Sequence, residues 1–385
     1  MTRRVGVVAY AQTRFSKSKD DLEIAELVHE VVSEVLAKSG LTFSDDGLGI
    51  DATVSCSQDH WDGRTISSQP VCDVAGGHLR AEEKVAGDGA LAVYYAALQI
   101  ASGHYDRVLV VAHCKESQTE GPLIENAGFD QIYHRQLGLD FLAAGAMQAN
   151  EYLNRYGITR DQCARVVVKN RRNGRLNPYA QGLPLVSLEE VLSSPMVADP
   201  IAALDAKPPS DGACALILAS EEETKRLTDR PVWLVGMGCC YDAHFLGQRS
   251  LSEAKALELA SKRAYAMAGI TSPSKAIDVV ELSEYYSYQE LLWLEGLGLC
   301  PPGQAGELTA GGVTELTGEL PVNPSGGLLS GVPVTVAGLS RVIEVVRQLR
   351  GEAGEAQVRA ARLGLAHGTS GACGQMQCAL VLATE

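Results

Sequence analysis

The stretch DLEIAELVHEVVSEVLAKSGLTFSDDGLGIDATVSC, residues 21–56, decides the fold, because its order of elements occurs twice in the chain. Its apolar residues recur at spacings of three and four, which predicts an amphipathic helix that ends at Gly40. A short loop and a strand follow. The stretch SEAKALELASKRAYAMAGITSPSKAIDVVELS, residues 252–283, has the same order, with Gly269 at the end of its helix.

Two further pairs of segments extend this match outward. ALAVYYAALQIASGHYDRVLVVAHC (90–114) and GLSRVIEVVRQLRGEAGEAQVRAARLGLAHG (338–368) both predict a helix, a glycine and a strand that ends at Ala-His. SDGACALILAS (210–220) and SGACGQMQCALVLAT (370–384) both predict a central buried strand. Three pairs in one order indicate a duplicated β/α half.

The duplication predicts an α/β protein with two domains, residues 1–225 and 226–385. The first half contains an insertion at about 115–200, in which residues 137–158 have a helical period. Long insertions of this kind commonly act as lids or interfaces.

Composition limits the classes of function. The 385 residues carry a net charge of −14, which argues against a nucleic-acid or anionic-membrane surface. No apolar run approaches the ~20 residues that span a bilayer, and the start MTRRVGVVAYAQTRF has no signal-peptide core, so we expect a cytoplasmic protein. The ten cysteines show no metal-ligand spacing, so we expect reduced thiols and no metal in this chain.

Three stretches carry a resemblance to a known family: residues 150–181, 290–307 and 318–351. They read NEYLNRYGITRDQCARVVVKNRRNGRLNPYAQ, ELLWLEGLGLCPPGQAGE and GELPVNPSGGLLSGVPVTVAGLSRVIEVVRQLRG. The chain resembles the sterol-carrier-protein type of thiolase over nearly its whole length. That resemblance implies the thiolase fold: two duplicated βα halves, with mixed five-stranded sheets in an αβαβα layering, plus an inserted loop domain.

The resemblance also shows which catalytic groups are missing. The family's nucleophilic cysteine, at the start of a buried helix, aligns with Ala86 in Ala-Gly-Asp-Gly. The family's basic histidine aligns with Val332 in the segment GVPVTVAG. Neither side chain can attack a thioester or accept a proton, so we do not expect covalent acyl transfer by this chain alone.

Six residues remain as catalytic candidates by the same resemblance. Asp88, next to the empty nucleophile position, would cap the helix or act as a base. Ser283 stands at the oxyanion-donor position, Glu284 at an acidic position that orients its neighbours, and Tyr285 is either a packing residue or an acid–base group. The last glycine-rich loop adds two candidates, His367 and Cys373.

Coenzyme A binding is implied in the same way. In thiolases the insertion covers the pantetheine arm of coenzyme A, so Lys169, Arg171 and Arg172 would meet its phosphates or form a solvated face. The segment VNPSGG appears unchanged from the family pattern, which assigns Asn323, Gly326 and Gly327 to the binding region.

The resemblance predicts a thiolase-like subunit of a heteromeric, CoA-dependent complex that makes or cleaves a C–C bond beside an acyl-CoA thioester. The alternatives are a retro-aldolase that acts on a β-hydroxyacyl-CoA with tyrosine or aspartate groups, and a non-catalytic CoA-binding or scaffold subunit. The implied partners are acyl-CoA, a second thiolase-like chain in a homodimer or heterodimer, and a small zinc-ribbon/OB-fold protein.

Overall fold

The computed structural model describes residues 3–44 and 49–385. The two segments of each predicted pair form the same elements in the same order. The first pair is α1 (Ile24–Ser39) with β2 (Ala52–Cys56), and α8 (Lys255–Ala268) with β9 (Val279–Glu281). The helices α1 and α8 end at the predicted glycines, Gly40 and Gly269, which both adopt the left-handed conformation.

The other two pairs also match. One is α2 (Gly89–Ala101) with β4 (Arg107–Lys115), against α12 (Ala337–Arg350) with β10 (Leu363–Ser370). The other is β7 (Asp211–Ser220) against β11 (Met376–Ala383). The remaining strands of the large sheet are β1 (Val5–Gln12), β3 (Ala81–Val85) and β8 (Val232–Tyr241).

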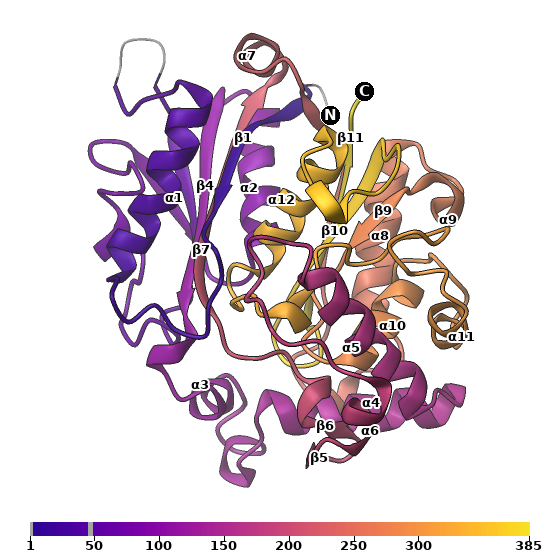
Figure 1. The fold of residues 1–385 in the computed structure, drawn as a ribbon. Coiled ribbons are helices and arrows are strands. Elements are labelled where there is room, and N and C mark those ends of the chain that lie inside the picture. Colours follow the sequence, from indigo (N-terminus) through magenta and orange to yellow (C-terminus); the bar gives the residue numbers. More distant parts are fainter. Residues whose placement is uncertain (1–2, 45–48) are drawn as a thin grey trace.

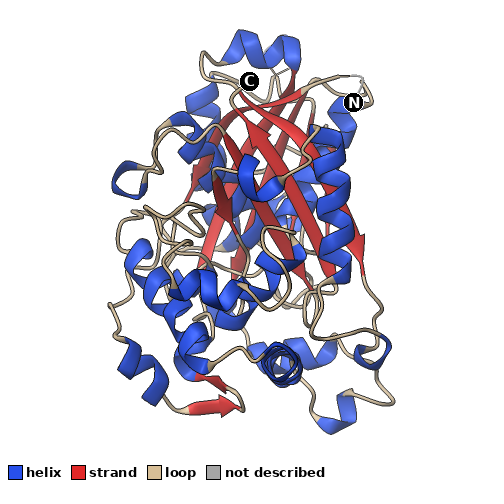
Figure 2. Ribbon diagram, turned by 90° about the vertical axis from the view of Figure 1, so that its right-hand side faces the viewer, coloured by secondary structure: helices blue, strands red, loops and turns tan. Residues whose placement is uncertain are grey.

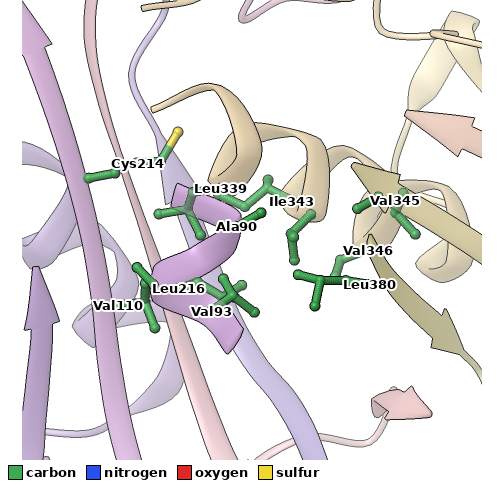
Figure 3. Close-up of a cluster of buried hydrophobic side chains, with 14 of the residues drawn as sticks. Ala90, Val93, Val110, Cys214, Leu216, Leu339, Ile343, Val345, Val346 and Leu380 are labelled. Atoms are coloured by element: carbon green, nitrogen blue, oxygen red, sulfur yellow. The ribbon is translucent and has the colours of Figure 1, made fainter. Parts of the chain in front are cut away.

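Five layers follow from how these helices pack. The helix α1 covers the strands of the first half, α8 covers those of the second half, and α2 and α12 lie side by side between the two sets of strands (Figure 1). Side chains of the two central helices meet buried residues of β4, β7 and β11, such as Val110, Leu216 and Leu380 (Figure 3). The αβαβα layering predicted by the resemblance is confirmed.

The sheets differ from the expected pair of five-stranded sheets. One nine-stranded sheet runs in the order β3-β2-β4-β7-β1-β8-β11-β10-β9, because β1 and β8 pair antiparallel and join the two halves. The second half supplies four of these strands. Where a fifth strand would lie, a single parallel bridge joins Val280 and Val322. Pro321 and Pro324 flank that bridge, and proline has no N–H with which to continue a ladder.

The insertion between β4 and β7 forms a helical lobe at one end of the sheet (Figures 1 and 2). Its elements are α3 (Gly121–Ala127), α4 (Phe141–Tyr156), α5 (Arg160–Gly174), α6 (Leu188–Ser193), β5 (Met196–Ala198) and β6 (Ile201–Ala202). The helix α4 falls within the segment of predicted helical period.

The shorter helices α7 (Glu221–Leu227), α9 (Pro273–Ala276) and α11 (Ala305–Ala310), together with α10 (Ser287–Gly296), complete the fold. Among the residues that the structure describes, no helix combines the length and apolar character needed to cross a bilayer.

Candidate active site

The N-termini of the two central helices meet at one carboxylate. Asp88 is the N-cap of α2 and accepts a hydrogen bond from the Ala90 amide at 2.9 Å. Its second oxygen accepts from the Gly338 amide, in the first turn of α12, at 2.8 Å. A Cβ atom on Gly338 or Gly368 would lie about 2 Å from Asp88 Oδ1, so these glycines enclose the carboxylate. This placement favours the capping role.

Burial raises the pKa of Asp88 to about 7, and the backbone N–H groups that it caps oppose that rise. The side chain is fully buried. Of the two positions that the resemblance assigns to the nucleophile and the base, Ala86 is exposed two residues before the cap, and Val332 is buried in the central core.

Ser283 and His367 use their polar atoms within the protein interior. The Ser283 hydroxyl donates to the His367 backbone oxygen at 2.9 Å, and the Ser283 amide faces His367 Nδ1 at 3.3 Å. His367 Nε2 lies 2.6 Å from Gln377 Oε1. Burial lowers the pKa of His367 to about 4, so the ring is neutral, with Nδ1 as acceptor and Nε2 as donor. This placement favours a structural role for both residues.

Glu284 belongs to a buried polar network that joins the second half to the insertion. It accepts hydrogen bonds from the side chains of Asn170 and Asn323 and from the Leu329 amide. Both asparagines also bond Glu290. Burial and then the neighbouring Glu290 carboxylate raise the pKa of Glu284 to about 8. Because both oxygens of Glu284 accept hydrogen bonds inside this network, its placement favours a role in positioning its neighbours.

The three basic residues predicted to meet coenzyme A do not converge. Lys169 is buried and forms an ion pair with Glu290, with Nζ 2.7 Å from Oε1. Arg172 is exposed and pairs with Glu315. Arg171 is buried, and its Nε has no hydrogen-bond partner among residues 3–44 and 49–385. The structure therefore offers no common basic surface made by these three residues.

The segment with Asn323, Gly326 and Gly327 has a structural reason for its sequence. A Cβ atom on Gly327 would lie 2.0 Å from Glu284 Oε1, and one on Gly326 would lie 2.2 Å from Ser330 Oγ. Both glycines have positive φ angles. These positions hold the network around Glu284, and in the described chain none of them lines the cavity beside Tyr285.

Cys373 is buried, and its thiol lies 3.1 Å from the Ala144 oxygen. Burial raises the pKa of this thiol to about 12, which leaves almost no thiolate at neutral pH. Its placement favours packing over nucleophilic chemistry.

Tyr285 has a different environment from the other five candidates. It lies between β9 and α10 and lines a cavity of about 360 Å³, a volume within the range of ligand sites. Tyr286 lines the same cavity, and its ring stacks on Tyr288. Within the described residues, the hydroxyls of Tyr285 and Tyr286 have no hydrogen-bond partner. The cavity is lined by Trp61, Glu116, Thr119, Gly121, Pro122, Glu125, Asp140, Leu142, Ala206, Lys207, Pro209, Tyr285, Tyr286 and Val334.

Charged residues of the insertion and its flanks surround these phenols. Glu116 is fully occupied: it accepts from Lys207 Nζ at 2.8 and 2.9 Å and from the amides of Ser210 and Val334. Val334 lies two residues after Val332, so Glu116 anchors that loop. Glu125 is half-buried and bonds only the Phe141 amide, at 3.1 Å, among the described residues.

Burial, followed by the carboxylates of Asp88, Glu116 and Glu125, raises the pKa of Tyr285 well above 10. At neutral pH this phenol is protonated and can donate a hydrogen bond or a proton. It cannot serve as a ready base.

Sequence reasoning missed Glu116, Glu125 and Lys207. Glu116 directly follows β4, and the carboxyl end of a strand is where α/β sheets place their ligands, so its position was a usable signal. Glu125 stands in the short helix α3 and Lys207 in the irregular segment before β7, and neither has a motif around it.

Comparisons with known proteins agree with this fold. The family model described as "Thiolase, N-terminal domain" matches residues 5–222, and the one described as "Thiolase C-terminal domain-like" matches residues 240–384. The chain belongs to the thiolase superfamily. The predicted family and fold are thereby confirmed.

Individual relatives place the chain within this superfamily. Acetyl-CoA acetyltransferase of Methanothermobacter thermautotrophicus is 34% identical over 386 residues, which cover 97% of this chain and 97% of that protein. Sterol carrier protein 2 of Oryctolagus cuniculus is 38% identical over 224 residues, or 56% of this chain and 41% of that protein. The likeness supports the sterol-carrier-protein branch of the thiolases.

A solved structure titled "Ltp2-ChsH2(DUF35) aldolase" superposes with a TM-score of 0.84 and 25% identity, and the match covers 99% of this chain and 98% of that one. The similar proteins thus include both acyltransferases and an aldolase.

Proposed function

We propose that this thiolase-like chain is catalytic and cleaves, or in reverse forms, a C–C bond beside an acyl-CoA thioester by retro-aldol chemistry on a β-hydroxyacyl thioester. The observation that carries the proposal is the unpartnered Tyr285 hydroxyl in the cavity. It occurs in a chain that has Ala86 and Val332 where a thiolase needs its cysteine and histidine.

The chemistry requires a donor where negative charge develops. Cleavage of the bond between the α and β carbons leaves an enolate of the thioester, which a protonated phenol stabilises and then protonates. Tyr285 has the required protonation state, since its pKa is raised. The route needs no covalent acyl-enzyme, which Ala86 cannot form.

The cavity suits the acyl end of the substrate. Trp61, Leu142 and Val334 supply apolar walls, whereas Glu125 and Asp140 would repel phosphates. We therefore place the β-hydroxyacyl group and the thioester inside the cavity, and the phosphates of coenzyme A outside it.

Support for a complex comes from the similar structure whose title names both an aldolase and a DUF35 partner. We propose that this chain likewise works with a small partner of that class and with a second thiolase-like chain.

The test uses the complex purified from its native source, a panel of 3-hydroxyacyl-CoA thioesters, and the Tyr285→Phe variant. Carbonyl product is measured without added free coenzyme A. We expect the variant to lose ~10²- to 10⁴-fold in turnover, the range for removal of a general acid. Assembly, measured by size-exclusion chromatography, stays unchanged.

Tyr241→Phe is the matched control, because that tyrosine is exposed at the end of β8. Unchanged turnover in Tyr285→Phe would contradict the proposal and leave the chain a scaffold. Product that forms only with free coenzyme A, on a cysteine of a partner chain, would instead make this chain the non-catalytic half of a thiolase.

A further inference from the structure

A retro-aldol step needs a base for the β-hydroxyl proton, and the residues predicted for proton transfer do not supply one at the cavity. Asp88 is fully buried between two helix N-termini, and both nitrogens of His367 are engaged in the interior. The base must come from groups that line the cavity.

Three carboxylates line the cavity, and each accepts at least one backbone hydrogen bond. Glu116 accepts from Lys207 and from two backbone amides, so its oxygens are occupied. Asp140 caps α4 through the Ala143 amide at 2.7 Å. Glu125 uses one oxygen for the Phe141 amide, and its Oε1 has no partner within the described residues.

The electrostatic setting of Glu125 fits a base that works near neutral pH. Burial raises the pKa of Glu125 to about 7, the Phe141 amide and Lys207 oppose the rise, and Asp140 and Glu116 add to it. General bases are most effective when their pKa lies near the working pH. The other titratable groups at the cavity, Tyr285 and Tyr286, both have a raised pKa and face Glu125 as neutral phenols.

We propose that Glu125, from helix α3 of the insertion, takes the β-hydroxyl proton of the substrate while Tyr285 donates a proton to the enolate. This inference rests on the proposed function and names the second half of its acid–base pair.

The step balances in atoms and charge. The Glu125 carboxylate takes the hydroxyl proton, the oxygen electrons form the carbonyl, and the bond between the α and β carbons breaks. Its electron pair passes into the thioester enolate, and Tyr285 protonates the α carbon. Afterwards one proton passes from Glu125 to the Tyr285 phenolate, which restores both groups. The products are an aldehyde or ketone and a shortened acyl thioester.

The experiment compares the pH dependence of kcat/KM in wild type, Glu125→Gln and Tyr285→Phe, each in the assembled complex. In wild type kcat/KM should rise with pH through about 7, because Glu125 must be ionised, and then level off, because Tyr285 stays protonated. Glu125→Gln should lose ~10²- to 10⁴-fold in kcat and lose the acid limb. Tyr285→Phe should be slow but keep that limb.

Glu120→Gln is the matched control, since Glu120 is an exposed carboxylate that directly precedes α3. Glu125→Asp tests whether a carboxylate as such is needed, and partial recovery of kcat with the acid limb is expected. Carbon-13 NMR titration of Glu125 supplies a readout besides activity, with a midpoint near 7 expected.

The outcomes separate the two proposals. A slow Tyr285→Phe beside a Glu125→Gln with wild-type rate and acid limb overturns the role of Glu125 and leaves the proposed function standing. A Glu125 that titrates near 4.3, the ordinary value for glutamate, also overturns that role. A wild-type complex that cleaves no β-hydroxyacyl thioester overturns both.

Discussion

Asp88 satisfies amide groups of two helices at once, one from each half of the duplicated chain. A helix start leaves several N–H groups without partners, and in a fully buried setting each such group is costly. Replacing the carboxylate with a methyl group removes both acceptors and leaves a small void.

We expect Asp88→Ala to lower the free energy of unfolding by about 2 to 4 kcal/mol, the loss of a cap and of a buried acceptor combined. Urea unfolding measures the change. Asp229→Ala, at an exposed residue, should shift stability by less than about 0.5 kcal/mol. Equal effects of the two changes would contradict the double cap.

Cys373 provides a chemical prediction at the same scale. With a pKa of about 12 and a buried Sγ, it should resist alkylation of the native protein by iodoacetamide at pH 8. Peptide mass spectrometry locates the modified cysteines, with the half-exposed Cys240 as internal control. Modification of Cys373 as fast as that of Cys240 would contradict its packing role and support nucleophilic chemistry at this thiol.

In helix α5, the surroundings of each basic side chain determine its role. From the sequence, Lys169 and Arg172 look like members of one basic cluster, because a linear pattern shows charge but no partner. In the structure they lie in different surroundings: Lys169 balances a fully buried Glu290, and Arg172 forms a surface pair with Glu315.

We expect Lys169→Met to cost about 3 to 5 kcal/mol of stability, because it leaves the Glu290 charge buried without its partner. Arg172→Met should cost less than about 1 kcal/mol, as for most surface pairs. Thermal unfolding of both variants measures the difference. If Arg172→Met were instead the more destabilising change, the assignment of Lys169 to a buried ion pair and of Arg172 to a surface pair would be wrong.

At the scale of the whole molecule, several buried carboxyl groups have raised pKa values: about 7 for Asp88, about 7 for Glu281 and about 8 for Glu284. Burial is the first cause in each case. The folded protein therefore keeps protons at these groups at a pH where the unfolded chain has released them.

Rising pH thus favours unfolding. The contribution of these carboxyl groups to the free energy of unfolding is fully present below about pH 4 and is lost as pH rises through 7 to 8. Between pH 6.5 and 7.5 we expect the free energy of unfolding to fall by at most ~1.4 kcal/mol for each such group. His367, whose pKa is lowered to about 4, makes stability rise with pH, but only below pH 6.5. Chemical unfolding at several pH values checks the sign, and a rise in stability over this interval would contradict it.

Much of the fold was open to prediction, because helix periods, glycine stops and strand runs are local properties of the sequence. The repeat of these patterns around residues 21–56 and 252–283 predicted the two halves. The joining of both sheets into one was missed, because it depends on the pairing of β1 with β8, which lie far apart in the sequence. The missing fifth strand of the second half was missed for a similar reason, since only one bridge joins Val280 to the distant Val322.

The candidate site was predicted only in part. The family resemblance predicted that Ala86 and Val332 replace the thiolase cysteine and histidine, and it named Tyr285 among six candidates. It could not show that Ser283, His367 and Cys373 point into the interior, because a polar side chain's burial depends on what packs around it.

The sequence by itself therefore determined the duplicated architecture and the family, and it predicted the loss of the usual nucleophile and base. Only the tertiary structure decided which polar groups remain available for chemistry. Tyr285, Glu125 and Lys207 come from three distant segments, and they share a cavity because the insertion packs against the second half. A raised pKa and an unused oxygen are properties of that packing, since burial and missing partners arise only when the whole chain has folded.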